Sequence, residues 1–105
     1  ASGAAFNGPP GQSVYAASKR AVAGATLPLA RDLAPYGIRV MTIAPGFFKT
    51  PLAEGVDDRH IDKLISMVPF PKRWGDPREL GELVKFICQN RMLNGETIQI
   101  DGAMR

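Results

Sequence analysis

Apolar and small residues recur at helical spacing across the first third of the chain. The positions that share this face are Val14, Ala17, Ser18, Ala21, Val22, Ala25, Leu29 and Leu33. This spacing predicts a long helix from Ser13 to Leu33. Pro28 lies inside the pattern, where it removes one backbone hydrogen bond and collides with the preceding turn. We therefore expect a bend or a local break near Ala25.

Two short apolar runs have the character of strands. Pro35 and Gly37 end the helical pattern, and the run Ile38–Ala44 that follows is rich in β-branched residues with little polar alternation. Such a run is typical of a strand covered on both faces. Near the end of the chain, a turn at Asn94 and Gly95 precedes a second strand at Thr97–Ile100.

The segment between the two strands divides into an irregular part and a helical part. Prolines interrupt the stretch 46–75, which has room for one short helix over Asp58–Met67. Asp76 is a good N-cap, Pro77 suits the first helical position and Glu79 lies three residues after Asp76. These signals predict a second firm helix from Pro77 to Gln89.

The order helix, strand, loop, helix, strand predicts an α/β fold with a parallel strand pair. Parallel strands need a crossover connection, and the predicted helix Pro77–Gln89 supplies it. Two strands cannot bury the apolar faces of these helices, so we expect more sheet beside them than the chain contains. The start of the chain, ASGAAFNGPPG, reads as a loop, and we expect further chain before it.

Composition and charge narrow the classes of function. Apolar residues make up 45% of the chain and charged residues 22%, as in folded proteins. The net charge of +3 comes from scattered residues, so we expect neither a nucleic-acid nor a membrane partner. Cys88 and His60 are each the only residue of their kind, which argues against a disulfide or a zinc site. We interpret Cys88 as a small core residue, His60 as a solvated helix residue, and the compartment as intracellular.

Tyr15 and Lys19 are the first candidates for catalytic residues. They are four positions apart in the run YAASK, so both side chains leave the same face of the predicted helix. An ammonium beside a phenol favours the phenolate, which can then exchange a proton with a hydroxyl or carbonyl group. The spacing alone is also compatible with the plain surface of an amphipathic helix.

A longer series of landmarks resembles the short-chain dehydrogenase/reductase family. In chain order they are Ser2, the run YAASK, Ile38-Arg39-Val40, Pro45-Gly46, Thr50 and Asp101-Gly102. The resemblance implies that residues 1–105 are the C-terminal, catalytic and substrate-binding portion of a single doubly wound Rossmann domain that binds NAD(P). The portion would comprise about two strands and two to three helices. The glycine-rich nucleotide-binding half of the family's fold does not occur in these residues.

The resemblance also implies roles for individual residues. Tyr15 would be the general acid/base, Lys19 would assist it and hold the nicotinamide ribose, and Ser2 would orient the substrate oxygen. Gln12 would face the substrate, beneath a lid formed by residues 50–74. The residues expected beside the nicotinamide group are Pro45, Gly46, Phe47 and Thr50, although a plain turn at the end of a strand is the alternative for this segment.

The activity implied is interconversion of a secondary alcohol and a ketone with NAD or NADP, of which NAD is favoured. The segments VPFPKRWGDP and LNGETIQIDGAMR are similar to the branch of the family that acts on 3-hydroxyacyl-CoA, which makes an acyl-CoA the expected substrate. A homodimer or homotetramer is expected, in the cytoplasm or in the mitochondrial matrix of a eukaryote. The alternative is a truncated, inactive chain that acts only in assembly or interaction.

Overall fold

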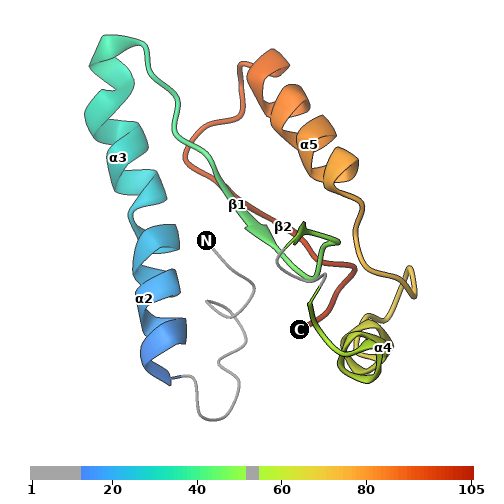
Figure 1. Cartoon of the computed structure of the whole chain (residues 1–105). Coiled ribbons are helices and arrows are strands. Elements are labelled where there is room, and N and C mark those ends of the chain that lie inside the picture. The colour runs from blue at the N-terminus through green and yellow to red at the C-terminus, as the bar shows by residue number, and fades with distance from the viewer. Residues whose placement is uncertain (1–12, 52–54) are drawn as a thin grey trace.

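The computed structural model describes residues 13–51 and 55–105. The elements follow in the order α2 (Ser13–Gly24), α3 (Thr26–Leu33), the 3-10 turn η1 (Ala34–Tyr36), β1 (Thr42–Pro45), α4 (Asp58–Ser66), α5 (Pro77–Gln89) and β2 (Thr97–Ile100). In Figure 1 the α2–α3 pair lies on one side of the two strands and α5 on the other. The α/β class predicted from the order of elements is confirmed.

Of the bend or local break expected near Ala25, the structure shows a local break, because Ala25 separates α2 from α3. Pro28 has no backbone N–H, so the carbonyl of Gly24 receives no helical hydrogen bond from it. The ladder continues on both sides of this gap, because Ala25 N donates to Ala21 O at 3.1 Å and Leu29 N donates to Ala25 O at 3.0 Å. The two helices therefore remain nearly continuous in direction (Figure 1).

Strands β1 and β2 pair in parallel, with Thr42 opposite Thr97 and Pro45 opposite Ile100. The parallel arrangement is confirmed, but the predicted beginning of the first strand at Ile38 is wrong. Pairing starts at Thr42, because the partner strand has residues only from Thr97 onward. Upstream of that point, Val40 N donates instead to the Asn94 side chain at 2.9 Å.

Arg39 links the entry to β1 with the end of α5. Its guanidinium donates to the carbonyl oxygens of Ile87 at 2.8 Å, Cys88 at 3.1 Å and Leu93 at 3.0 Å. The last carbonyls of a helix have no partner within the helix, and a cation at this end interacts favourably with the negative end of the helix dipole. Arg39 thus fixes the C-terminal end of α5 beside β1.

Helix α5 begins and ends where the sequence predicts, and α4 ends one residue earlier than predicted. On α5, Ile87 is buried while Cys88 is exposed. The interpretation of Cys88 as a core residue is wrong, because successive helical residues point about 100° apart and only one of this pair can face the sheet.

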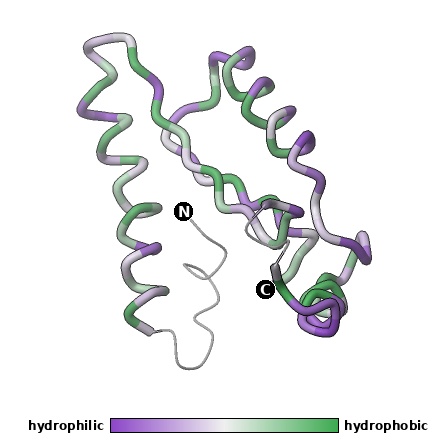
Figure 2. Tube along the Cα trace, in the orientation of Figure 1, coloured by the Kyte–Doolittle hydropathy of each residue, from purple (hydrophilic) through white to green (hydrophobic). Residues whose placement is uncertain are grey.

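The buried core is made mainly of small side chains: Ala16, Ala30, Ala44, Val68 and Ile87. Among the residues that the structure describes, no large side chain is completely buried, and Phe70 and Met92 are 81% and 92% exposed. Figure 2 shows apolar positions recurring along α2, α3 and α5. In the same ranges, no helix combines the length and apolar character needed to cross a membrane.

Candidate functional site

Parallel strands end at the same edge of a sheet, and the ends of β1 and β2 form the centre of the candidate site. Gly46, directly after β1, donates its N–H to the carbonyl of Ile100 at 3.0 Å. A Cβ on Gly46 would lie 2.6 Å from Cβ of Asp101. The turn at the end of β1 therefore packs directly on the backbone after β2, which only glycine permits.

Asp101, directly after β2, is the buried acidic residue at this edge of the sheet. It is 8% exposed, and its carboxylate accepts hydrogen bonds from Ala103 N at 2.9 Å and from Arg105 at 3.2 and 3.3 Å. Three donors compensate the buried carboxylate for the water it has lost. The resemblance marks Asp101 only as a landmark, whereas in the structure its carboxylate fixes the turn after β2, against which Gly46 packs.

A cavity of about 410 Å³ opens beside the turn. Four of its lining residues are those expected to contact the cofactor: Pro45, Gly46, Phe47 and Thr50. The other lining residues are Phe48, Val56, His60, Ile61, Leu64 and Leu80. Val56, His60, Ile61 and Leu64 belong to the segment 50–74 expected as a lid, although the sequence interpretation singled out none of them for this cavity. Phe48 and Leu80 were not anticipated there. His60 is exposed as expected, yet it also lines this cavity.

Tyr15 and Lys19 lie together on α2, as their spacing predicts. The Lys19 ammonium nitrogen is 5.4 Å from the centre of the Tyr15 ring. Tyr15 is about half exposed. Ser18 does not compete for this hydroxyl, because its Oγ donates to the backbone carbonyl of Tyr15 at 2.8 Å.

The predicted site residues thus fall into two groups in the structure, Tyr15 with Lys19 on α2 and the cavity-lining residues after β1. Ser2 and Gln12 lie outside the described residues, as does part of the expected lid, 52–54. No group of three or more potential metal ligands occurs within residues 13–51 and 55–105.

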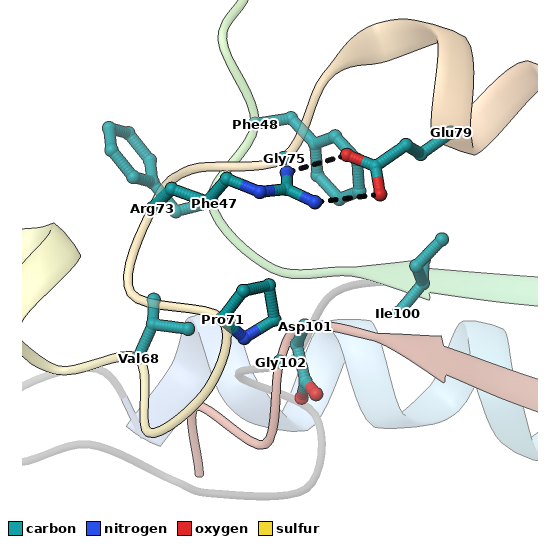
Figure 3. A pocket seen from close by; sticks show the side chains of 10 residues that line it. All are labelled: Phe47, Phe48, Val68, Pro71, Arg73, Gly75, Glu79, Ile100, Asp101 and Gly102. Carbon is teal, nitrogen blue, oxygen red and sulfur yellow. Dashed lines mark hydrogen bonds and ion pairs between the residues drawn. The ribbon is translucent and has the colours of Figure 1, made fainter.

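A second, smaller cavity of about 160 Å³ lies between the turn, the end of β2 and the N-terminal end of α5. Figure 3 shows Arg73 and Glu79 joined to each other along one side of it, with Phe48 and Gly75 alongside. The guanidinium of Arg73 makes two hydrogen bonds to the Glu79 carboxylate, at 2.6 and 3.1 Å. These bonds, together with the hydrogen bond from the N–H of Asp76, lower the pKa of Glu79 to about 2. The spacing of Asp76 and Glu79 signalled the helix cap but not the role of Arg73.

The whole chain, residues 1–105, matches the family model described as enoyl-(acyl carrier protein) reductase. It is 58% identical over 105 residues to the 3-hydroxyacyl-CoA dehydrogenase type-2 of Bos taurus, a match that covers all of this chain and 40% of that protein. The chain therefore spans about two fifths of the length of such relatives.

Solved structures agree with the sequence comparison. The crystal structure of 3-hydroxyacyl-CoA dehydrogenase type-2 from Mycobacterium avium superposes with a TM-score of 0.93 at 47% identity, covering 100% of this chain and 41% of that one. A protein assigned as a 2-deoxy-D-gluconate 3-dehydrogenase from Agrobacterium tumefaciens, solved with bound NADP, gives a TM-score of 0.84 at 30% identity, covering 99% of this chain and 44% of that one. From its sequence matches and its Rossmann-like fold, the chain belongs to the short-chain dehydrogenase/reductase family of oxidoreductases.

Proposed function

We propose that the protein carrying this chain interconverts a secondary alcohol and a ketone with NAD or NADP, and that its substrate is a 3-hydroxyacyl-CoA. Membership of an oxidoreductase family supports the reaction class. The names of relatives that are more than half identical to the chain support the substrate. The single observation that carries the chemistry is the pairing of Tyr15 with Lys19 on one face of α2.

In this proposal Tyr15 is the general acid/base. Its phenol carries an exchangeable proton, and the ammonium of Lys19 lies 5.4 Å from the ring centre on the same helix. When an alcohol is oxidised, the phenolate accepts the hydroxyl proton, and the phenol returns it when a ketone is reduced. Ser2 would orient the same substrate oxygen, and Gln12 would contact the substrate.

The residues after β1 fit a dinucleotide. Gly46 lets the turn lie directly against Asp101, and Pro45, Gly46, Phe47 and Thr50 together line the cavity that would receive the nicotinamide ring. Thr50 would offer its hydroxyl to the carboxamide or the phosphates, and Lys19 would hold the nicotinamide ribose. When bound, the nicotinamide group supplies or accepts the hydride. Of the two dinucleotides we favour NAD.

The apolar side of the same cavity suits an acyl chain. Val56, Ile61, Leu64 and Leu80 present aliphatic carbon to it from α4, the segment before α4, and α5. Burial of aliphatic carbon is favourable in proportion to area, so a chain of several methylenes would gain from each contact. We also propose a homo-oligomer, supported by exposed apolar side chains such as Phe86 and Met92.

Substitution of Tyr15 tests the proposal. In the protein that carries this chain, Tyr15→Phe should lower kcat by roughly 100-fold or more, because it deletes the transferable proton. The affinity for NADH, measured by fluorescence titration, should change little because almost no binding surface is lost. Tyr36→Phe, which alters an exposed tyrosine in η1, is the matched control and should retain full activity.

Two results would count against the proposal. Undiminished turnover in Tyr15→Phe would show that Tyr15 is not the general acid/base. If the unsubstituted protein bound neither NADH nor NADPH saturably, the proposal that it uses a nicotinamide dinucleotide would be wrong. The same pair of titrations decides between NAD and NADP.

A further inference from the structure

Arg73 connects the N-terminal end of α5 with the chain segment just before it. Its guanidinium donates two hydrogen bonds to the Glu79 carboxylate and a third to the carbonyl of Trp74, at 3.1 Å. Glu79 is itself fixed, because Oε1 also accepts the N–H of Asp76 at 3.0 Å as part of the helix cap. The guanidinium therefore holds the backbone around Trp74 at a set position relative to the helix.

The residue after Trp74, Gly75, makes two backbone hydrogen bonds to the segment that follows β1. Its N–H donates to the carbonyl of Phe47 at 2.8 Å, and its carbonyl accepts the N–H of Lys49 at 2.9 Å. These two bonds enclose Phe48, and a Cβ on Gly75 would collide with the Phe48 ring. Backbone contact this close transmits any displacement of Gly75 to Phe47.

The rings of Phe47 and Trp74 reinforce the connection, with centroids 5.4 Å apart. From Glu79 through Arg73, Trp74 and Gly75, a continuous series of contacts thus reaches Phe47, one residue after Gly46. Figure 3 shows the Arg73–Glu79 pair directly beside Phe48 and Gly75, above the end of β2.

A neighbouring ion pair shows what is particular to Arg73. Arg78 and Asp76 also form an ion pair at 3.0 Å at the start of α5, but the Arg78 side chain is 87% exposed. Within residues 13–51 and 55–105, the hydrogen bonds of the Arg78 guanidinium all go to Asp76, so this pair links no further segment. Both arginines contact a carboxylate through two nitrogens, but Arg73 is the less exposed of the two and also donates to the Trp74 carbonyl, which extends its contact beyond the carboxylate.

We propose that Arg73 and Glu79 act as a positioning pair that holds the Pro45–Phe47 turn in the shape that binds the nicotinamide end of the dinucleotide. The pair acts through Gly75 and touches neither substrate nor dinucleotide. This inference rests on the proposed function, since it concerns the same binding turn.

The test compares Arg73→Ala with Arg78→Ala in the full-length protein, by NADH titration and by hydrogen exchange of backbone amides. Arg73→Ala should raise the Kd for NADH about five-fold, the effect of losing one well-formed ion pair from a binding-competent state. It should also speed exchange at the N–H groups of Lys49 and Gly75. Arg73→Lys keeps the charge but loses the two-point contact, so it should fall between Arg73→Ala and the unsubstituted protein. Arg78→Ala should leave both readouts unchanged.

Equal NADH affinity in Arg73→Ala and Arg78→Ala would overturn the positioning role, even if the Arg73 variant were less stable. Unchanged exchange at Lys49 and Gly75 would overturn it as well, because the contact series would then not depend on Arg73. Failure of the unsubstituted protein to bind either dinucleotide would instead overturn the proposed function. Hydrogen exchange would still report in that case whether Arg73 fixes Gly75, so the two failures are distinguishable.

Discussion

Gly46 is the residue at which the two strand ends approach most closely. Its N–H is bonded to Ile100, and the space that a side chain would need is filled by the backbone and Cβ of Asp101. Asp101 cannot withdraw easily, because Arg105 and the N–H of Ala103 hold its carboxylate. The turn after β1 can therefore follow this path only because Gly46 has no side chain.

Gly46→Ala should destabilise the protein by about 1–3 kcal/mol, the usual cost of forcing extra carbon into a packed site. The added methyl must also move the turn, so dinucleotide affinity should fall with stability. Gly81→Ala is the control, because Gly81 lies in α5 with no atom near its missing Cβ. That control should stabilise by about 1 kcal/mol through helix propensity. Thermal unfolding of both variants measures the difference, and equal shifts would contradict the packing argument.

At the scale of elements, a capping box and two ion pairs fix the N-terminal end of α5. Asp76 accepts the N–H of Arg78 at 2.9 Å, and Glu79 reaches back to the N–H of Asp76. Hydrogen bonding with Arg73 brings the pKa of Glu79 to about 2, and hydrogen bonding with Arg78 lowers the pKa of Asp76. Both carboxylates are stabilised in their charged form in the folded protein.

A lowered folded-state pKa contributes stability above the ordinary pKa of the group and loses it as the pH falls through the folded value. For Glu79 that window runs from the ordinary value of 4.5 down to about 2. Glu79→Gln should therefore reduce the free energy of unfolding at pH 7, and the difference from the unsubstituted protein should shrink as the pH falls through this window. Chemical denaturation at several pH values measures it, with Glu82→Gln on the same helix as control. A difference that stays constant from pH 7 to pH 2 would contradict this account.

At the scale of the whole molecule, the apolar surface exceeds what the described residues can cover. Strand residues 42, 43 and 97–100 are only partly buried, and Val14, Phe70 and Met92 are almost fully exposed. Relatives are about two and a half times as long as this chain, which covers 40% of the one from Bos taurus. The expectation of additional sheet beside β1 and β2 has its physical basis in these uncovered faces.

The 105 residues produced on their own should therefore bind a hydrophobic dye such as ANS and unfold without a sharp transition. Saturable NADH binding should be absent, because a pyrophosphate site requires a glycine-rich turn at a helix N-terminus. Dye fluorescence and NADH titration of the isolated chain, beside the full-length protein, provide the measurement. A cooperatively unfolding, dye-free chain would support the alternative of an independent assembly module.

Local chemistry made several elements predictable from the sequence alone. Pro28 determines the break at Ala25, because a missing N–H acts on its own helix. Asp76, Pro77 and Glu79 determine the start of α5, because a cap involves only adjacent residues. The pairing of Tyr15 with Lys19 follows from helix geometry alone. The roles proposed for these two residues came from a family resemblance and await the kinetic test.

Only the tertiary structure decided the rest, because those features depend on residues distant in sequence. The guanidinium of Arg39 reaches carbonyls from Ile87 to Leu93. The segment before Thr42 is no strand, because pairing with β2 begins at Thr97 and Val40 N bonds to the Asn94 side chain instead. The orientation of Cys88 follows from which face of α5 meets the sheet. The cavity beside Gly46 exists because residues some thirty to fifty positions apart lie together, and the same is true of the hydrogen bond from Gly75 to Phe47. The sequence by itself determined the elements and their order, and long-range packing determined the site they form.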